Sequence, residues 1–533
     1  MTLPRNVLFI MADQLRWDCL SCYGDSLVST PNIDQLAKEG VTFDRAYCQS
    51  PICGPSRMSF YTGRYSQSHG ATWNGIPLKA GELTLGNFMR EQGLATWLVG
   101  KTHFYPDLSG IQRMGIGLDS PTGQLLQQCG FQIFDRMEGL YPEGPKGRYN
   151  PLKSNYEKYL NDLGYFGQNP WNDWANSAEG ENGAVLEGWY MQNAHRPARV
   201  AEEHSETAYT TNRALEFLKL HGQSPWCLHL SYIKPHWPYI APSPYHQLFR
   251  DLELPSAIRS QNELKNPHPI YEALTKIRVS RAFSKREVRD RVLPTYLGLV
   301  KQLDDHLGRL FQFMKDQGSF DQTLIVFTSD HGDYLGDHWL GEKDWFHEPS
   351  VKIPLIIRDP SPSANSSRGS RSKELVESID LIPTFIEALG GTFPDHILEG
   401  KSLNPLLHSE STESIRECAI SEYDYSVAPI SSQLNADPKK ARIYMVATQR
   451  WKYIHTVGYR PVLFDLQEDP MELNDLGDDA GYSKIKRELN DQLLEWSLRH
   501  SQRVTRSDSE LVSRRGRSEG LGIRIGFWEE NED

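Results

Sequence analysis

The sequence predicts an α/β protein with a large, mainly parallel sheet, helices on both faces, and a small C-terminal antiparallel α+β subdomain. Short apolar runs alternate with helical patterns over residues 1–410, which is typical of βα units that cover a parallel sheet. From about residue 411 the pattern changes to closely spaced alternating strands. The 533 residues, 38% of them hydrophobic, are enough to bury a large core. We therefore expect one large domain over 1–410 and a small one over 411–533.

The elements of the large domain follow from apolar runs and from residues that start or stop helices. Residues 6–11 (NVLFIM) predict a buried first strand. Residues 31–40 predict a helix, because Pro31 takes its first position and Gly40 lies just past its end. The same order continues along the chain, with expected helices at 84–93, 206–220, 288–317 and 377–391, and expected strands at 95–100, 226–233, 323–329 and 351–359.

Two regions depart from this pattern. Residues 105–205 are rich in Gly, Pro, Asn and Trp and have little periodicity. This predicts a long insertion over one face, which fits a site-shaping role and plain surface decoration equally well. In the small subdomain, strands are expected at 418–425, 442–449 and 451–458, with a helix at 484–498. The charged tail after Ser501 is expected to be either mobile or an arm that grips another subunit.

Composition excludes several classes of partner. The chain has 57 Lys and Arg against 69 Asp and Glu, a net charge of −12, which disfavours nucleic acid and anionic membranes. It contains no apolar run of the roughly 20 residues that cross a bilayer. Its first residues predict a strand and not a signal peptide. Seven cysteines are few and odd in number, so we expect a reducing, cytoplasmic location without a disulfide framework.

Chemistry-bearing residues stand directly after several predicted strands. Asp13, Lys101, His236 and Asp330 occupy such places, and ligands of α/β sheets bind where loops leave the carboxyl ends of strands. A further local signal is Cys53, which precedes a helix opened by Pro-Ser and therefore lies near a positive helix N-terminus. A buried structural cysteine fits this spacing equally well.

The string from Cys53 to Arg64 (CGPSRMSFYTGR) resembles the C-x-P-S-R-x-x-x-x-T-G-R signature of the sulfatase family, and the segments RWKYIHT and LFDLQEDPMELNDL are also typical of it. The resemblance implies the alkaline-phosphatase-like fold. It further implies that a formylglycine-generating maturation enzyme oxidises Cys53 to formylglycine, whose hydrated aldehyde is the nucleophile. The expected substrate is a small-molecule sulfate monoester, with an aryl sulfate preferred, cleaved through a covalent sulfo-enzyme intermediate.

The resemblance also implies a site for one divalent cation. Carboxylates and an imidazole at strand ends suit such an ion. Many sulfatases carry a second aspartate where this chain has Gln14, which either ligates through its amide oxygen or only binds substrate. Asn74 is expected to bind substrate. Calcium and manganese both remain open as the metal, and the expected ligands are Asp13, Cys53 in its modified form, Asp330 and His331.

Five further residues match catalytic positions of the family. Lys101 and His103 form its G-K-x-H element, and Lys343 matches its second lysine. Arg57 and the two lysines are expected to neutralise the oxygens of the sulfate group. His236, together with Lys343, is expected to protonate the leaving oxygen, and His103 to take a proton from the second hydroxyl of the hydrated aldehyde.

Two other functions compete with this one. Hydrolysis of phosphonate monoesters or phosphodiesters would use the same apparatus, and Asp13-Gln14, Asn74 and the C-terminal half resemble that branch. Those enzymes tend to lack the Lys101–His103 pair, which favours sulfate. A non-catalytic binding protein on the sulfatase scaffold is less favoured because Cys53 and the candidate ligands are intact. Family resemblance and the C-terminal tail predict a homo-oligomer, either a dimer or a tetramer.

Overall fold

The main sheet of the protein has nine strands. The computed structural model describes all residues except 1–2, 25, 141–153, 410–413, 500–502 and 530–533. The strand order is β11-β2-β10-β8-β1-β7-β3-β4, and β9 pairs with β2 beside this path. The strands are β1 (Asn6–Ala12), β2 (Val41–Tyr47), β3 (Ala95–Gly100), β4 (Gln132–Arg136), β7 (Trp226–Tyr232), β8 (Thr323–Ser329), β9 (Lys352–Ile353), β10 (Leu355–Arg358) and β11 (Ser370–Glu377).

Most of this sheet is parallel, as predicted. The run β8-β1-β7-β3-β4 is parallel throughout. On the other side β10 is antiparallel to both β8 and β2, while β11 is parallel to β2. Three strands, β2, β4 and β11, were not expected from the sequence. Charged residues interrupt the apolar patterns of these three strands. In addition, β4 and β11 are the two edge strands of the sheet, and many of their side chains are exposed or half-buried.

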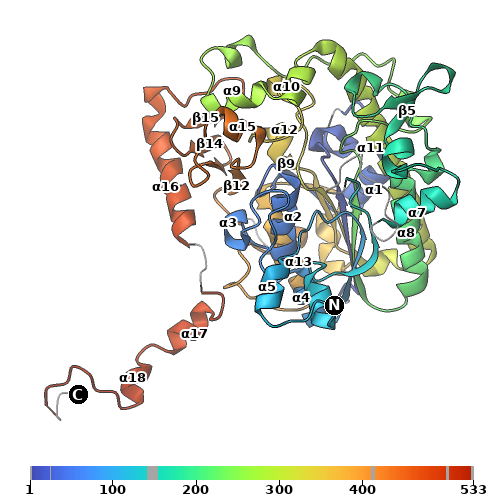
Figure 1. Cartoon of the computed structure of the whole chain (residues 1–533). Helices are drawn as coiled ribbons and strands as arrows, with labels where there is room; N and C mark the ends of the chain where they lie inside the picture. The colour runs from blue at the N-terminus through green and yellow to red at the C-terminus, as the bar shows by residue number, and fades with distance from the viewer. Residues whose placement is uncertain (1–2, 25, 141–153, 410–413, 500–502, 530–533) are drawn as a thin grey trace.

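Helices cover both faces of the sheet (Figure 1). Along β1, Leu8 and Ile10 belong to the core on one face, whereas Val7, Phe9 and Met11 belong to the core on the other. This alternation buries both faces of a central strand. The first face packs against α1 (Pro31–Glu39), α8 (Glu206–His221) and α11 (Arg286–Asp316), and the second against α2 (Cys53–Thr62), α4 (Leu85–Glu91) and α13 (Leu381–Ala388).

The segment 105–205 is more than an insertion over one face. Its strand β4 pairs in parallel with β3 and so extends the main sheet. Its other described residues form loops, single helical turns and a few short elements, and residues 141–153 lie outside the described part of the chain. These elements are α5 (Leu108–Arg113), α6 (Pro121–Leu126), α7 (Asn155–Asp162) and the hairpin of β5 (Ser177–Glu179) and β6 (Val185–Glu187). Other short helices are α3 (Ser66–His69), α9 (Pro269–Thr275), α10 (Arg278–Phe283), α12 (Glu348–Val351), α14 (Asn404–Leu407) and α15 (Pro429–Gln433).

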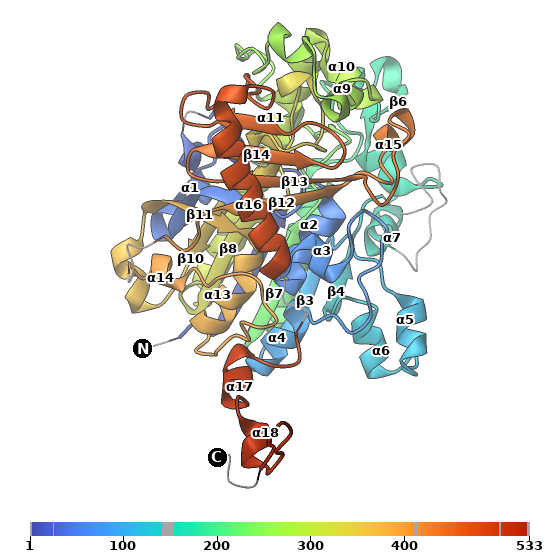
Figure 2. The same ribbon diagram turned by 90° about the vertical axis from the view of Figure 1, so that its left-hand side faces the viewer.

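A second, four-stranded antiparallel sheet forms the C-terminal part, which confirms the predicted α+β pattern. Its strands are β12 (Ala419–Asp424), β13 (Arg442–Ala447), β14 (Trp451–Thr456) and β15 (Val462–Asp465), paired in that order. Helix α16 (Ser483–Arg499) lies across this sheet (Figure 2). The buried Lys452 of β14 pairs with Glu348 of α12 at 2.8 Å and thereby ties this sheet to the main body.

The last described residues form an arm. Helices α17 (Asp508–Ser513) and α18 (Arg517–Gly520) extend away from the body in both views (Figures 1 and 2). Several apolar side chains along it are exposed, among them Ile525 and Trp528 at 92% and 88%. All seven cysteines are free thiols. Within the described ranges, the helices are too short or too polar to cross a membrane.

Candidate active site

Four neighbouring parallel strands deliver the core of the site. The strands β8, β1, β7 and β3 stand side by side in the sheet. Asp330, Asp13 and Lys101 directly follow β8, β1 and β3, and His236 lies four residues beyond the end of β7. Because the carboxyl ends of parallel strands meet at one edge, residues far apart in the sequence come together there.

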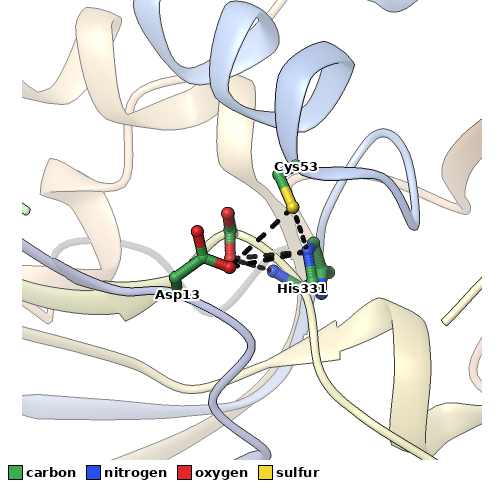
Figure 3. A group of neighbouring side chains, drawn as sticks. Asp13, Cys53 and His331 are labelled. Atoms are coloured by element: carbon green, nitrogen blue, oxygen red, sulfur yellow. Dashed lines mark hydrogen bonds and ion pairs between the residues drawn. The ribbon is translucent and has the colours of Figure 1, made fainter. Parts of the chain in front are cut away.

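Cys53 lies at the centre of this edge. It is the first residue of α2 and is buried. Its Sγ atom lies 2.9 Å from Lys343 Nζ, 3.0 Å from His331 Nε2 and 3.8 Å from Asp13 Oδ1, and Figure 3 shows the side chain pointing from the helix start toward Asp13 and His331. Burial would raise the pKa of the thiol, but the positive charges of Lys343, His331 and Lys101 outweigh it and hold that pKa well below its usual value. The site therefore favours an anion at this position.

The residues around Cys53 offer ligands for a divalent cation. Ligand atoms of Asp13, Cys53, Asp330 and His331 all lie within 4.8 Å of one another, and all four residues are buried. The Nδ1 atom of His331 bonds to the carbonyl oxygen of Gly332 at 2.9 Å, which leaves its Nε2 facing the group. The neighbouring Gln14 adds a buried Oε1 atom that no described residue hydrogen-bonds. Two carboxylates, an imidazole and an orphaned amide oxygen fit a divalent cation.

Arg57 organises the two carboxylates. It is completely buried in the middle of the site. Its Nε donates to Asp330 Oδ2 at 2.8 Å and its Nη2 to Asp13 Oδ2 at 3.1 Å. Its Nη1 donates to the carbonyl oxygen of Lys101 and to Ser231 Oγ. Four of its five N–H donors are therefore committed to the protein. This geometry suits holding the two carboxylates in place, and the expected contact of Arg57 with sulfate oxygens stays a prediction.

Two buried lysines supply positive charge toward Cys53. Lys101 Nζ contacts Asp13 Oδ2 at 2.6 Å, and Lys343 Nζ contacts both Cys53 Sγ and His331 Nε2, the latter at 3.2 Å. Burial would lower the pKa of each lysine, but the negative charges of Asp13 and Cys53 raise both above their ordinary value. Both ammonium groups are therefore charged at neutral pH.

His236 and His103 lie on different segments around Cys53. His236 Nε2 lies 4.0 Å from Asp13 Oδ1, and its Nδ1 bonds to the carbonyl oxygen of Trp237 at 2.7 Å. Burial lowers the pKa of His236 to about 4, so the ring is neutral at pH 7 in the ligand-free protein. His103 has left-handed backbone (φ 54°) and contributes to the lowered pKa of Cys53.

Asn74 supports the start of α2. Its Oδ1 accepts a hydrogen bond from the backbone N–H of Gly54 at 2.8 Å. A Cβ atom added at Gly54 would lie 2.7 Å from this oxygen, so the close approach requires glycine. Asn74 thus lies next to Cys53, and because the oxygens of an anionic ester accept hydrogen bonds, its NH2 group would be the contact to substrate, which stays a prediction.

Sequence reasoning did not identify Glu138, which shapes one side of the site. Its carboxylate accepts hydrogen bonds from the backbone N–H groups of Thr102 and His103, at 3.1 and 2.8 Å, and from Thr102 Oγ1 at 2.6 Å. Arg136 contacts it at 2.7 Å. Glu138 lies in the 105–205 segment, whose lack of periodicity carries no signal for such a contact. Asp333 and Tyr239, which both accept hydrogen bonds from Gln14 Nε2, were also missed, although Asp333 follows His331 so closely that the string DHGD could have indicated it.

Comparisons with known proteins agree with this site. Residues 5–391 match the family model described as Sulfatase, and residues 336–499 match the model described as N-sulphoglucosamine sulphohydrolase, C-terminal. The chain is 32% identical over 535 residues to the Multifunctional alkaline phosphatase superfamily protein PehA of Trinickia caryophylli, covering 94% of this chain and 96% of that protein. It is 26% identical over 492 residues to the Arylsulfatase of Clostridium perfringens, covering 90% and 91%.

The fold is shared with solved structures as well. The Phosphonate monoester hydrolase SpPMH from Silicibacter pomeroyi superimposes with a TM-score of 0.80 at 27% identity, covering 93% of this chain and 96% of that one. Together with the main sheet and the buried Asp-Cys-Asp-His group, this defines a hydrolase of the alkaline phosphatase superfamily. Within that superfamily the chain belongs to the sulfatase family, a family of sulfuric ester hydrolases, which confirms the prediction from the Cys53 signature.

Proposed function

We propose that the protein hydrolyses a small sulfate monoester, with an aryl sulfate preferred, using formylglycine at position 53 and one divalent cation. The observation that carries the proposal is the position of Cys53 Sγ, which lies against Lys343 and His331 within the buried ligand group. This sulfur marks the place that an oxygen of the hydrated aldehyde would take after oxidation by a maturation enzyme. The modified residue would supply the nucleophile.

The charges of the site suit a monoanionic ester. A cation held by Asp13, Asp330, His331 and residue 53 would supply positive charge to the sulfate oxygens and lower the pKa of the attacking hydroxyl. Lys101 and Lys343 are both charged and both face Cys53 or its carboxylate neighbour. They would bind the remaining oxygens of the sulfate group. Arg57 would contribute by keeping Asp13 and Asp330 in register.

Proton transfer would fall to His236, Lys343 and His103. His236 is neutral in the ligand-free protein, so it would act as an acid only after the negative charge of a bound ester raises its pKa. Lys343 is already protonated and contacts Cys53 Sγ at 2.9 Å. The two together would protonate the leaving oxygen. His103, whose backbone N–H donates to Glu138, would accept the proton of the second hydroxyl of residue 53 as the aldehyde re-forms and sulfate leaves.

A second candidate function is hydrolysis of phosphonate monoesters or phosphodiesters with the same residues. The similarity to PehA and to the phosphonate monoester hydrolase of Silicibacter pomeroyi favours it. The Lys101–His103 pair favours sulfate instead. A binding protein without activity has less support, since the full set of charged residues surrounds Cys53.

Rates on matched esters separate these functions. We expect the matured enzyme to show a higher kcat/KM for 4-nitrophenyl sulfate than for 4-nitrophenyl phenylphosphonate, measured as release of 4-nitrophenol. Choline sulfate, followed by sulfate release, tests the preference for an aryl group. A higher kcat/KM on the phosphonate ester would assign the second function. Absence of turnover on all three, with formylglycine confirmed at position 53, would contradict both enzymatic functions for these substrate classes.

Glu138 offers a test of the Lys101–His103 side of the site. We expect Glu138→Gln to lower kcat/KM about 10- to 100-fold, on the order of the loss that follows small displacements of catalytic groups. The N–H groups of Thr102 and His103 donate to different oxygens of the carboxylate, and the amide puts an NH2 group, which cannot accept, in place of one of these oxygens. Steady-state kinetics on the preferred ester measure the effect. Glu179→Gln, an exposed carboxylate in the same segment, is the matched control. Equal kcat/KM in both variants would exclude this role for Glu138.

The domain roles complete the proposal. Residues 1–410 would form the catalytic domain, and the 105–205 segment would help to shape its site, as the contact of Glu138 with His103 supports. Residues 411–533 would form the small subdomain. Its arm would bury exposed apolar side chains such as Ile525 and Trp528 in a dimer or tetramer.

A further inference from the structure

Gln14 is held rigidly beside the cation ligands. It follows Asp13, is completely buried, and has left-handed backbone with φ 63°. Such a conformation is uncommon for a residue other than glycine and persists only where the surroundings impose it. Here the backbone N–H donates to Asp330 Oδ1 at 3.0 Å, and the carbonyl oxygen accepts from the Tyr296 hydroxyl at 2.7 Å. The backbone of Gln14 is therefore fixed by the loop that follows β8 and by helix α11.

Two residues outside the ligand group determine which end of the Gln14 amide points where. Gln14 Nε2 donates to Asp333 Oδ2 at 2.5 Å and to the Tyr239 hydroxyl oxygen at 3.2 Å. The Tyr239 hydroxyl donates its one hydrogen bond to the same Asp333 oxygen, at 2.6 Å. Both partners therefore present acceptors to Gln14, and only the NH2 end of the amide satisfies them. The carbonyl end must face away from the Asp333–Tyr239 pair.

The carbonyl oxygen so directed has no partner within the protein. Gln14 Oε1 is buried and accepts no hydrogen bond from the described residues. A buried acceptor left unsatisfied costs about 1–3 kcal/mol, and the surrounding hydrogen bonds prevent the amide from rotating to avoid this cost. An unpartnered amide oxygen next to Asp13 and Asp330 is a ligand that hard divalent cations use. The arrangement therefore has the form of a preoriented ligand.

We propose that Asp333 and Tyr239 are positioning residues that orient the Gln14 amide so that its oxygen serves the divalent cation. The inference rests on the proposed function only in requiring a cation among Asp13, Asp330 and His331. Asp333 and Tyr239 are outside the ligand group and contact Gln14 and each other. They act by orienting the amide group of Gln14, just as residues that hydrogen-bond to metal ligands commonly orient those ligands.

Direct measurement of cation affinity tests this inference. The full-length, matured enzyme is stripped with a chelator and titrated with Mn²⁺ and, separately, with Ca²⁺ in a calorimeter. For the cation that binds wild type, we expect Tyr239→Phe to raise the Kd about 10-fold and Asp333→Asn to raise it up to about 100-fold. Saturating cation should restore much of kcat. Tyr23→Phe, which removes a buried hydroxyl whose partners are backbone oxygens of Phe43 and Leu355 outside the ligand group, should leave the Kd unchanged.

A double-mutant cycle separates orientation from other effects. If Asp333 acts through Gln14, then Gln14→Ala/Asp333→Asn should bind the cation no more weakly than Gln14→Ala alone. Additive losses would show that Asp333 acts by its charge or through the loop that it holds by accepting from the Leu335 N–H, and would overturn the proposal. An unchanged Kd in Tyr239→Phe, which alters no charge, would overturn it as well. Because the readout is binding, it stays valid even if the enzyme turns over neither sulfate nor phosphonate esters.

Discussion

Replacing Cys53 with alanine is expected to abolish ester hydrolysis, with kcat/KM lower by a factor on the order of 10⁴ or more, as for removal of other covalent nucleophiles. Cys53 is the only nucleophile precursor that contacts Lys343, His331 and Asp13 together in the described part of the chain. Alanine leaves the charges of these neighbours in place but offers no atom to attack sulfur. Steady-state rates on the preferred ester measure the loss.

A second cysteine serves as the control. Cys227 of β7 is as buried as Cys53 but packs in the core away from the ligand group, so Cys227→Ala should keep the wild-type kcat/KM. Mass spectrometry of the Cys53 peptide from wild type should show conversion of the thiol to the aldehyde after expression with the maturation enzyme. Wild-type turnover in Cys53→Ala would refute the mechanism. A peptide that always remains a thiol would favour the binding protein.

Replacing Arg57 with glutamine is expected to damage both stability and activity. Removing one partner of a buried ion pair costs about 3–5 kcal/mol because the other charge stays buried without compensation, and Arg57 serves two such partners, Asp13 and Asp330. Glutamine is neutral, and its two N–H donors are on one nitrogen, so it replaces neither the charge nor the separately placed donors of Arg57. We therefore expect the free energy of unfolding of the chelator-treated protein to fall by about 3–5 kcal/mol and kcat/KM to fall at least about 100-fold. Denaturant unfolding and steady-state kinetics measure the two effects.

A second buried arginine, Arg358, is the control that separates an effect on the active site from a general loss of stability. Arg358 on β10 is also buried and pairs with Glu39 and Asp321 outside the site. Arg358→Gln should lower stability but leave kcat/KM unchanged at a temperature where the protein is folded. If Arg57→Gln lost less than about 1 kcal/mol of unfolding free energy, the size of an ordinary surface pair, the organising role of Arg57 would be excluded.

The sequence alone was enough to predict the central strands, several helices and the Cys53 signature. The runs around Asn6–Ala12 and Thr323–Ser329 are continuously apolar because both faces of a central parallel strand are buried, and this pattern needs no partner to be recognised. The helix Pro31–Glu39 carries its start and stop residues within itself. The Cys53 signature is equally local, since it lies within the continuous segment from Cys53 to Arg64. These features predicted the fold class, the family and most of the residues that meet at the site.

The tertiary structure decided which of these residues contact each other and what each one does. The strands β2, β4 and β11 escaped prediction because charged residues interrupt their apolar patterns, so that only their pairing in the folded sheet identifies them as strands. The donors of Arg57 could be assigned only once Asp13 and Asp330 were seen on either side of it. Glu138, Tyr239 and Asp333 act through hydrogen bonds that join distant segments. A hydrogen bond is directional and short, so its partners follow from packing in three dimensions and not from the spacing of residues along the chain.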